Sequence, residues 1–319
     1  MHTVDRLTKK VYAMGTSCEI TIYDKLDEEV LNSCIERLYD IENKMSVFKN
    51  ISDVSTINSN AGKGFSLVSP DTAYVIRMAK KYSNLSNGAF SITVKPLINL
   101  WKQKMKDNIF PNKEEIFEAL KLVNDNDILI RDNRVMLLNQ NQEIDLGSIA
   151  KGYAADEIKK LLEDYNVKSA IINLGGNVML VGKKLDNSKW QVGLQNPFKQ
   201  RGEIFGYIEL PEKTVVTSGS YERFYIINGI KFSHIINPIN GYPVSNTLAS
   251  VTVVTDNSID ADAMSTILFV LGLKDGIDFV KTLEEFETIF VATNKMVFCP
   301  STLKENIKIL DSTFEVSFY

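Results

Sequence analysis

The chain has 319 residues, of which 44% are hydrophobic and 24% charged, and its formal net charge is −4. These values are typical of a globular protein with a substantial core, built as one large domain or as two closely packed ones. No basic stripe indicates a nucleic-acid partner, and no Lys/Arg-rich amphipathic helix indicates a membrane surface. No apolar run approaches the length of a membrane-spanning segment.

The cysteines indicate a reducing compartment. Cys18, Cys34 and Cys299 are odd in number, and no two of them form a CxxC pair, so neither a disulfide framework nor a zinc site is expected. The N-terminal residues contain no apolar signal core. We therefore expect a cytoplasmic protein. The alternative, an export signal already removed from the sequence, stays open.

The first half of the chain is predicted to alternate helices with irregular segments. Residues 1–9 are expected to form an N-terminal tail, which holds His2, and residues 10–319 a single folded unit. The predicted elements are two strands within 10–24 around Gly15, a helix at 27–48, an irregular loop at 49–68, a helix at 70–86, an apolar connection at 89–101, a helix with a capping box from Asn112, and a hairpin at 127–138.

The second half is predicted to be richer in strands. Its elements are a helix from Ile149 to Tyr165, strands at 168–174, 177–182, 189–195, 204–210 and 214–218, a hairpin turning at Asn228-Gly229, a strand at 248–255, a helix at 258–271 capped by Ser258, a short helix at 275–285, a hairpin at 288–299, and a strand at 314–318. Because many strands are joined by hairpins, the pattern predicts an α+β fold with largely antiparallel or mixed sheets flanked by helices. No G-x-G-x-x-G motif supports a Rossmann site.

The segment Glu143–Asp156 has the sequence E-I-D-L-G-S-I-A-K-G-Y-A-A-D. It is predicted to end a buried strand, turn at Gly147-Ser148 and continue as a helix. Such a turn directs unpaired backbone N–H groups and a partial positive charge at one point, which suits an anion. Lys151 adds a full positive charge. An ordinary strand–helix corner that packs small residues explains the spacing equally well.

Asp262 and Thr266 lie four positions apart on the predicted helix at 258–271, with Ser265 alongside. Side chains at this spacing share one face of a helix, so a carboxylate and a hydroxyl would converge. Such hard oxygen ligands suit Mg²⁺. The spacing alone favours an ordinary structural role, because such pairs are common on helices.

His234 is the candidate base if the reaction needs an imidazole, because the only other histidine is His2. A structural histidine is the alternative. Two further segments, residues 173–177 (N-L-G-G-N) and 217–220 (T-S-G-S), would either approach a ligand or simply form a hairpin and end a strand. Phe48, Phe90 and Tyr153 would stack on a flat ring system or belong to the core.

The order of these motifs resembles one known family. The matching motifs are M-G-T-x-x-x-I at 14–20, G-A-F at 88–90, I-D-L-G-S-I-A-K-G-Y-A-A-D at 144–156, N-L-G-G-N at 173–177, T-S-G at 217–219, H-I-I-N-P-x-x-G-x-P at 234–243 and A-D-A-x-x-T at 261–266. Together they look like the FAD:protein FMN transferase (ApbE) family over about residues 10–300. The resemblance implies a single compact, T-fold-like unit.

The resemblance also implies an activity. Members of that family use Mg²⁺ to cleave FAD, attach the FMN moiety to a Ser or Thr hydroxyl of a target flavoprotein as a phosphoester, and release AMP. By similarity, the metal would be held by the carbonyl of Ala150, Asp262 and Thr266, with Ser265 adjacent. FAD would contact Met14, Phe48, Ala89, Phe90, Ser91, Gly147, Tyr153 and Ile236. His234 would be the base, and Lys151 would share the charge of the pyrophosphate.

Four positions depart from the family pattern. Ser91, Asn237 and Ser220 stand where the family usually has Asp, and Asn240 stands where it usually has Thr. The loss of carboxylates at 91 and 237 is expected to alter contacts with the ribose or adenine, or the orientation of His234. Two other functions stay open, a Mg²⁺-dependent FAD pyrophosphatase and a non-catalytic FAD-binding protein. The acceptors expected by analogy are flavin-carrying subunits of redox pumps or soluble flavoreductases.

Overall fold

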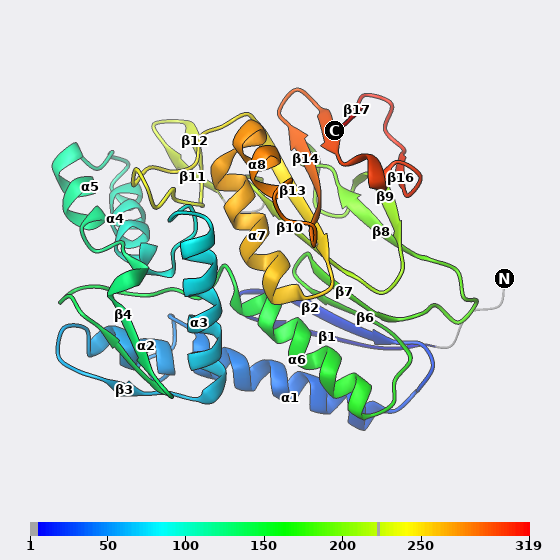
Figure 1. Cartoon of the computed structure of the whole chain (residues 1–319), viewed down its shortest axis with the longest axis horizontal. Helices are drawn as coiled ribbons and strands as arrows, with labels where there is room; N and C mark the ends of the chain where they lie inside the picture. The colour runs from blue at the N-terminus through cyan, green and yellow to red at the C-terminus, as the bar shows by residue number, and fades with distance from the viewer. Residues whose placement is uncertain (1–5, 222–223) are drawn as a thin grey trace.

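A nine-stranded sheet forms the centre of the computed structural model, which describes residues 6–221 and 224–319 (Figure 1). Its neighbouring strands are antiparallel except for the last pair, which is parallel. In spatial order they are β1 (Leu7–Ala13), β2 (Thr16–Ile22), β6 (Ser169–Leu174), β7 (Asn177–Gly182), β10 (Thr214–Gly219), β13 (Leu248–Thr255), β14 (Glu287–Ala292), β15 (Met296–Cys299) and β17 (Glu315–Phe318).

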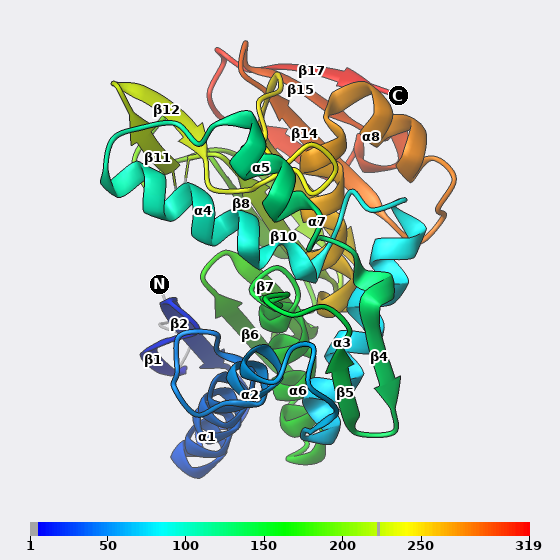
Figure 2. The same cartoon turned by 90° about the vertical axis from the view of Figure 1, so that its left-hand side faces the viewer.

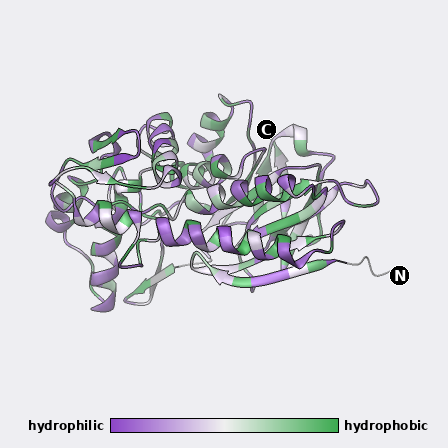
Figure 3. Ribbon diagram, turned by 90° about the horizontal axis from the view of Figure 1, so that it is seen from below, coloured by the Kyte–Doolittle hydropathy of each residue, from purple (hydrophilic) through white to green (hydrophobic). Residues whose placement is uncertain are grey.

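Helices cover one face of this sheet, and a second sheet covers the other. The covering helices are α1 (Glu28–Met45), α6 (Ala150–Asp164), α7 (Ser258–Leu271) and α8 (Leu273–Val280), and the second sheet consists of β16 (Ile307–Ile309), β9 (Ile204–Leu210) and β8 (Trp190–Gln195). Apolar residues line both interfaces and form two separate cores. In Figure 3 the helices on this side turn hydrophilic stripes outward, while the central strands are largely hydrophobic. Every residue of β13 is buried.

The remaining elements lie beside the sheet, at the left of Figure 1. They are α2 (Asp53–Ser59), β3 (Ser66–Leu67), α3 (Pro70–Leu85), η1 (Ile92–Val94), α4 (Lys95–Lys106), α5 (Lys113–Leu120), η2 (Asp125–Asp127), β4 (Ile128–Arg131), β5 (Arg134–Leu137), β11 (Phe224–Ile227) and β12 (Ile230–Ser233); η3 (Ser301–Leu303) lies near the C-terminus. A third, small core joins α4 and α5 to the β11–β12 hairpin, and Figure 2 shows these elements stacked together. No helix in the described residues is long and apolar enough to cross a membrane.

The predicted fold class, α+β with largely antiparallel sheets flanked by helices, is confirmed. The bounds of β7, β9 and β13 agree with the prediction residue for residue, and α7 ends at Leu271 as predicted. The β1 strand begins at Leu7, inside the stretch predicted as a tail, whereas His2 lies outside the described residues.

Two segments predicted to be irregular contain helices. Within residues 49–68, α2 begins with a reciprocal capping box between Ser52 and Ser55, and β3 follows it. The predicted connection at 89–101 contains the start of α4, with Pro96 in its first turn, where a missing N–H costs nothing. The short helix predicted at 275–285 begins and ends earlier, as α8.

Ser258 was predicted to cap the helix at 258–271. In the structure it is the first residue of α7 rather than its cap, and the preceding Asn257 makes no side-chain capping bond. The carboxylate of Asp156, on α6, accepts from the first two backbone N–H groups instead. This long-range cap fixes the start of α7 against α6.

Candidate active site

A cavity of about 520 Å³ lies where the first turn of α6, the β1–β2 turn and α7 meet. Most residues singled out from the sequence line it, although they come from six separate segments of the chain. The predicted residues in its wall are Met14, Phe48, Ala89, Phe90, Ser91, Gly147, Ala150, Lys151, His234, Ile236, Asp262 and Thr266.

The helices α6 and α7 come into contact at Gly152. A Cβ atom on this residue would meet the carbonyl oxygen of Ser258 and would lie 2.6 Å from the Cα of Ile259, so no side chain fits. The N–H of Gly152 donates to Oδ2 of Asp262 at 2.9 Å. The close approach therefore brings the motif around Lys151 directly to the carboxylate of α7.

Asp156 stabilises the contact between α6 and α7 one turn further along α6. Its two carboxylate oxygens accept from the backbone N–H groups of Ser258 at 2.7 Å and of Ile259 at 2.8 Å. Burial raises the pKa of Asp156 to about 6, against the opposing effect of these two hydrogen bonds. The position of α7 relative to α6 is thus set by a buried carboxylate.

Lys151 and Asp262 form an ion pair inside the cavity. The ammonium lies 2.8 Å from Oδ1 and 3.1 Å from Oδ2 of Asp262, whose residue is only 4% exposed. The same ammonium lies 3.4 Å from the carbonyl oxygen of Gly147. A positive charge and a buried carboxylate therefore stand together at the start of α6.

The oxygen atoms around Asp262 fit a hard divalent cation. Among the residues that the structure describes, Oδ1 of Asp262 accepts only from Lys151, and the hydroxyl of Thr266 makes one long bond, 3.4 Å, to the carbonyl oxygen of Asp262. Ala150 lines the cavity on the opposing helix. Within residues 6–221 and 224–319 no group of three or more His, Cys, Asp and Glu side chains is able to hold a metal. A Mg²⁺ ion here would therefore combine one carboxylate with hydroxyl, carbonyl and substrate oxygens.

The rim of the cavity offers an exposed aromatic ring. Phe48 is 78% exposed, and the ammonium groups of Lys95 and Lys102 lie 5.3 Å and 5.4 Å from its ring centroid. In the same cavity wall, the backbone N–H of Met14 donates to Glu42 at 2.7 Å. An exposed aromatic ring with two cations beside it is suited to stacking against a planar ligand that carries phosphate.

Ser91, which stands where the family usually has Asp, is bonded to a carboxylate from another segment. Ser91 donates its hydroxyl to Oδ1 of Asp125 at 2.6 Å, and Asp125 also accepts from the hydroxyl of Thr93 and from the backbone N–H of Ile92. Asp125 is only 4% exposed. Although Ser91 replaces the usual Asp of the family, it connects the cavity wall to the buried carboxylate of Asp125, which lies behind it.

The two asparagines after His234 stabilise the turn that follows it. The side chain of Asn237 accepts from the N–H of Ile239 at 2.8 Å, and that of Asn240 accepts from the N–H of Tyr242 at 3.0 Å. A carboxylate at 237 would accept in the same way. The departure at 237 therefore preserves the turn that presents His234 to the cavity.

Two predicted site residues do not line the cavity. The hydroxyl of Tyr153 donates to Asp71 at 2.6 Å, within a network that also contains Arg37, and Arg37 holds the pKa of Asp71 well below its usual range. Ser265 is fully buried, and its hydroxyl lies 2.8 Å from that of Ser218. It also donates to the carbonyl oxygen of Asp262 at 3.0 Å, so Ser265 contacts two residues that line the cavity without lining it itself.

Several residues that line the cavity were not proposed from the sequence. Glu42 and Lys102 belong to amphipathic helices, and nothing in their spacing separates them from ordinary surface charges. Asn177 follows the Gly-Gly pair that was singled out, but its own side chain was not considered. The T-S-G-S segment was noticed for its hydroxyls, and the contact of Ser218 with Ser265 gives one of them a partner.

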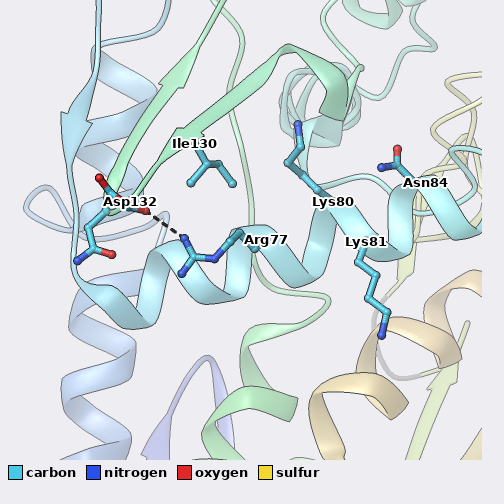
Figure 4. Close-up of a pocket in the computed structure, with 7 residues that line it drawn as sticks. Arg77, Lys80, Lys81, Asn84, Ile130 and Asp132 are labelled. Atoms are coloured by element: carbon cyan, nitrogen blue, oxygen red, sulfur yellow. Dashed lines mark hydrogen bonds between the residues drawn. The ribbon is translucent and has the colours of Figure 1, made fainter.

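A second hollow, about 770 Å³ in volume, lies between α3 and the β4–β5 hairpin (Figure 4). Its cations do not converge. Lys80 donates to the backbone oxygens of Asp125 and Ile128, Arg77 donates to that of Asp132, and Lys81 points to the opposite side of α3 from Lys80. These contacts hold the hairpin on the helix, and the hollow shows no built anion site.

The sequence profile of the ApbE family matches residues 14–290. The chain belongs to the ApbE family. It is 32% identical to the FAD:protein FMN transferase of Klebsiella pneumoniae (strain 342), over 95% of this chain and 94% of that protein. It is 27% identical to the FAD:protein FMN transferase of Treponema pallidum (strain Nichols), over 94% of this chain and 88% of that protein.

Solved ApbE structures share the fold. The ApbE protein of Thermotoga maritima aligns with a TM-score of 0.86 and 29% identity, covering 95% of this chain and 99% of that one. The flavin transferase ApbE of Vibrio cholerae aligns with a TM-score of 0.85 over the same shares, at 24% identity. The architecture described above is therefore the ApbE architecture.

Proposed function

We propose that this protein transfers the FMN moiety of FAD to a Ser or Thr hydroxyl of a target flavoprotein and releases AMP, with Mg²⁺ as cofactor. Family membership and the names of the curated relatives support the reaction class. The observation that carries the proposal is that His234, Lys151, Asp262 and Thr266 line one cavity. Together they provide a base, a cation and hard oxygen ligands, as phosphoryl transfer requires.

In the proposed reaction, the oxygen of the acceptor hydroxyl attacks the phosphorus on the FMN side of the pyrophosphate. The new P–O bond forms as the bond to the AMP phosphate breaks, and AMP leaves with that electron pair. His234 accepts the proton of the hydroxyl. Lys151 and the N–H groups of the turn at Gly147 and Ser148 bind the phosphate charge.

The residues that would hold Mg²⁺ are Asp262, Thr266 and the carbonyl of Ala150. When bound, the ion would neutralise the pyrophosphate and stabilise the leaving phosphate. Gly152 and Lys151 both donate to Asp262 and so fix the orientation of its carboxylate. Asp156 keeps the two helices that carry these ligands in contact.

The cavity wall would provide the remaining contacts with FAD. Phe48 and Phe90, from two separate segments, would contact the planar ring of FAD. The backbone around Met14 and Gly147 would allow FAD to approach closely. We also propose a cytoplasmic location. The three cysteines are buried and unpaired, which supports a reducing compartment.

The decisive experiment incubates the chain with FAD, Mg²⁺ and a flavin-accepting protein encoded beside it, and determines the mass of the acceptor. We expect a covalent FMN adduct on a Ser or Thr residue and an equal amount of AMP, both lost when EDTA replaces Mg²⁺. FMN and AMP without an adduct on a competent acceptor would contradict transfer and identify a pyrophosphatase. FAD that stays bound and intact would identify a flavin-binding protein.

A further inference from the structure

One buried carboxylate holds the Ala89–Ser91 wall of the cavity from behind. Asp125 belongs to η2, is only 4% exposed and does not line the cavity. Its Oδ1 accepts from the hydroxyls of Ser91 at 2.6 Å and Thr93 at 2.7 Å, and from the backbone N–H of Thr93 at 3.1 Å. Its Oδ2 accepts from the backbone N–H of Ile92 at 3.2 Å. The carboxylate therefore binds three consecutive residues, of which the first lines the cavity.

Hydrogen bonds, rather than a cation, stabilise the carboxylate of Asp125. The ammonium of Lys80 donates to the backbone oxygens of Asp125 and Ile128, both at 2.6 Å, and not to the carboxylate. A carboxylate that leaves water needs several donors to replace its hydration. The four donors described above all come from residues 91–93, so the burial of Asp125 depends on the conformation of that segment.

The same wall is fixed at both of its ends. At one end, the hydroxyl of Ser86, which ends α3, accepts from the N–H of Phe90 at 3.1 Å. At the other, the carbonyl oxygen of Ile92 accepts from the N–H of Asp145 at 2.8 Å, and Asp145 lies in the segment that leads into α6. The wall is therefore held between α3 and the anion-binding turn, with the buried carboxylate at its centre.

The hydroxyl of Ser91 has no proton left for a ligand. A hydroxyl carries one proton, and Ser91 gives it to Asp125, since an ionised carboxylate only accepts. The oxygen of the same hydroxyl accepts from the N–H of Thr93 at 3.2 Å. Ser91 therefore contributes to the cavity mainly through its backbone, and the position of that backbone depends on Asp125.

We propose that Asp125 is a positioning residue for FAD: without contacting the ligand, it holds the Ala89–Ser91 wall in the conformation that binds it. The inference rests on the proposed function, because it takes the ligand to be FAD. Removal of the carboxylate would leave four donors without their acceptor, and the wall would rearrange to find other partners. A site that must be ordered again on binding has a lower affinity than one already in place.

The first test measures the dissociation constant of FAD by flavin fluorescence, well below the unfolding temperature, and the steady-state constants of AMP release. Asp125→Asn keeps the shape of the side chain but turns one acceptor into a donor. We expect the dissociation constant and the KM for FAD to rise about 10-fold, with kcat changed less than about twofold. A residue that only stabilised the fold would lower the unfolding temperature and leave these constants unchanged.

The second test exchanges the two side chains. In the double variant Ser91→Asp with Asp125→Ser, the carboxylate stands at position 91, which already caps η1 by accepting from Thr93 and suits an aspartate. The hydroxyl at position 125 can then donate to it. We expect the double variant to bind FAD within about threefold of wild type, and Asp125→Ser alone to bind about 10-fold more weakly. Ser91→Asp alone should lose at least as much, because it places two carboxylates together.

Asp127→Asn is the matched control. Asp127 lies on the same η2, and its carboxylate accepts from the side chains of Asn124 and Asn139, away from the cavity wall. The control should leave FAD binding unchanged, and thermal unfolding should show which variants are folded. If Asp125→Asn does not fold, Thr93→Val removes one donor at similar volume and should weaken FAD binding about threefold.

Two results would overturn the inference. One is FAD affinity within about twofold of wild type in folded Asp125→Asn, or in Thr93→Val where that variant replaces it. The other is a folded double variant that binds FAD no better than Asp125→Ser. If the wild-type chain bound no FAD at all, the proposed function itself would fail.

Discussion

The ammonium of Lys151 lies 2.8 Å from Oδ1 of Asp262, although 111 positions separate the two residues in the chain. The pair joins the anion-binding motif of α6 to the carboxylate of α7. Each residue orients the other, and the N–H of Gly152 fixes the second carboxylate oxygen. Loss of either side chain should therefore damage the site while leaving the sheet intact.

Asp262→Asn is expected to lower the rate of AMP release by at least about 100-fold, because the carboxylate that is proposed to hold the metal is lost. Asp262→Ala should abolish release. Both rates are measured by chromatography of the nucleotide product at saturating FAD. Asp256→Asn is the control, since Asp256 lies two residues before α7 and pairs on the surface with Lys213. Near-normal turnover in a folded Asp262→Ala protein would refute the metal assignment.

Gly152→Ala is expected to lower the free energy of unfolding by about 1–3 kcal/mol, because the new methyl group would press α7 away from α6. FAD affinity should fall as well, since Asp262 moves with α7. Urea unfolding and flavin titration measure the two effects. Gly64→Ala is the matched control, because a Cβ atom there meets nothing within 4 Å. Equal behaviour of the two variants would show that the helix contact tolerates a side chain.

Tyr153→Phe tests whether the Tyr153 hydroxyl contacts FAD, as the family resemblance implies, or only stabilises the fold through Asp71. The hydroxyl donates to Asp71 outside the cavity, so its removal should cost about 1–2 kcal/mol of stability and change FAD affinity less than twofold. Tyr74→Phe, on the half-exposed ring that packs against Tyr153, is the control for stability. A large loss of FAD affinity in Tyr153→Phe would support the predicted contact of Tyr153 with FAD.

Asp156 should make stability depend on pH in the acidic range. Its pKa is about 6 in the folded protein against 3.8 for an unperturbed aspartate, so the folded protein retains this proton where the unfolded chain has lost it. The contribution is complete below pH 3.8 and disappears as the pH rises through about 6. Over this range, Asp156 contributes about 3 kcal/mol to the free energy of unfolding.

Asp156→Asn removes this titration. The free energy of unfolding of wild type minus that of Asp156→Asn should decrease between pH 4 and pH 6 and stay level above about pH 7. Urea unfolding at each pH measures it. Asp164→Asn, an exposed change on the same helix, should show no such difference. A wild-type advantage that grew with pH would contradict the assignment.

Local sequence patterns predicted most of the fold, whereas the family resemblance named most of the predicted residues that line the cavity. The limits of β13 follow from an apolar run and the end of α7 from a terminating glycine, which are local features. The start of α4 was missed because Pro96 normally ends a helix, and its position in the first turn depends on the fold around it.

Directions of side chains were harder to predict than positions. Tyr153 follows Lys151 by two positions, and residues so spaced face different sides of a helix. Whether Lys151 or Tyr153 faces the cavity is decided by the packing of α6 against α1 and α7.

The contact between Gly152 and Ser258 also has a consequence for how the protein is made. As the chain leaves the ribosome, α6 emerges with Lys151 long before Ser258 and Asp262 have been synthesised. Until α7 docks, the start of α6 lacks its carboxylate, and Asp156 and Asn177 both lack their partner. Assembly of the site is thus a late, long-range event, and a nascent chain that ends before α7 is expected to hold no ligand.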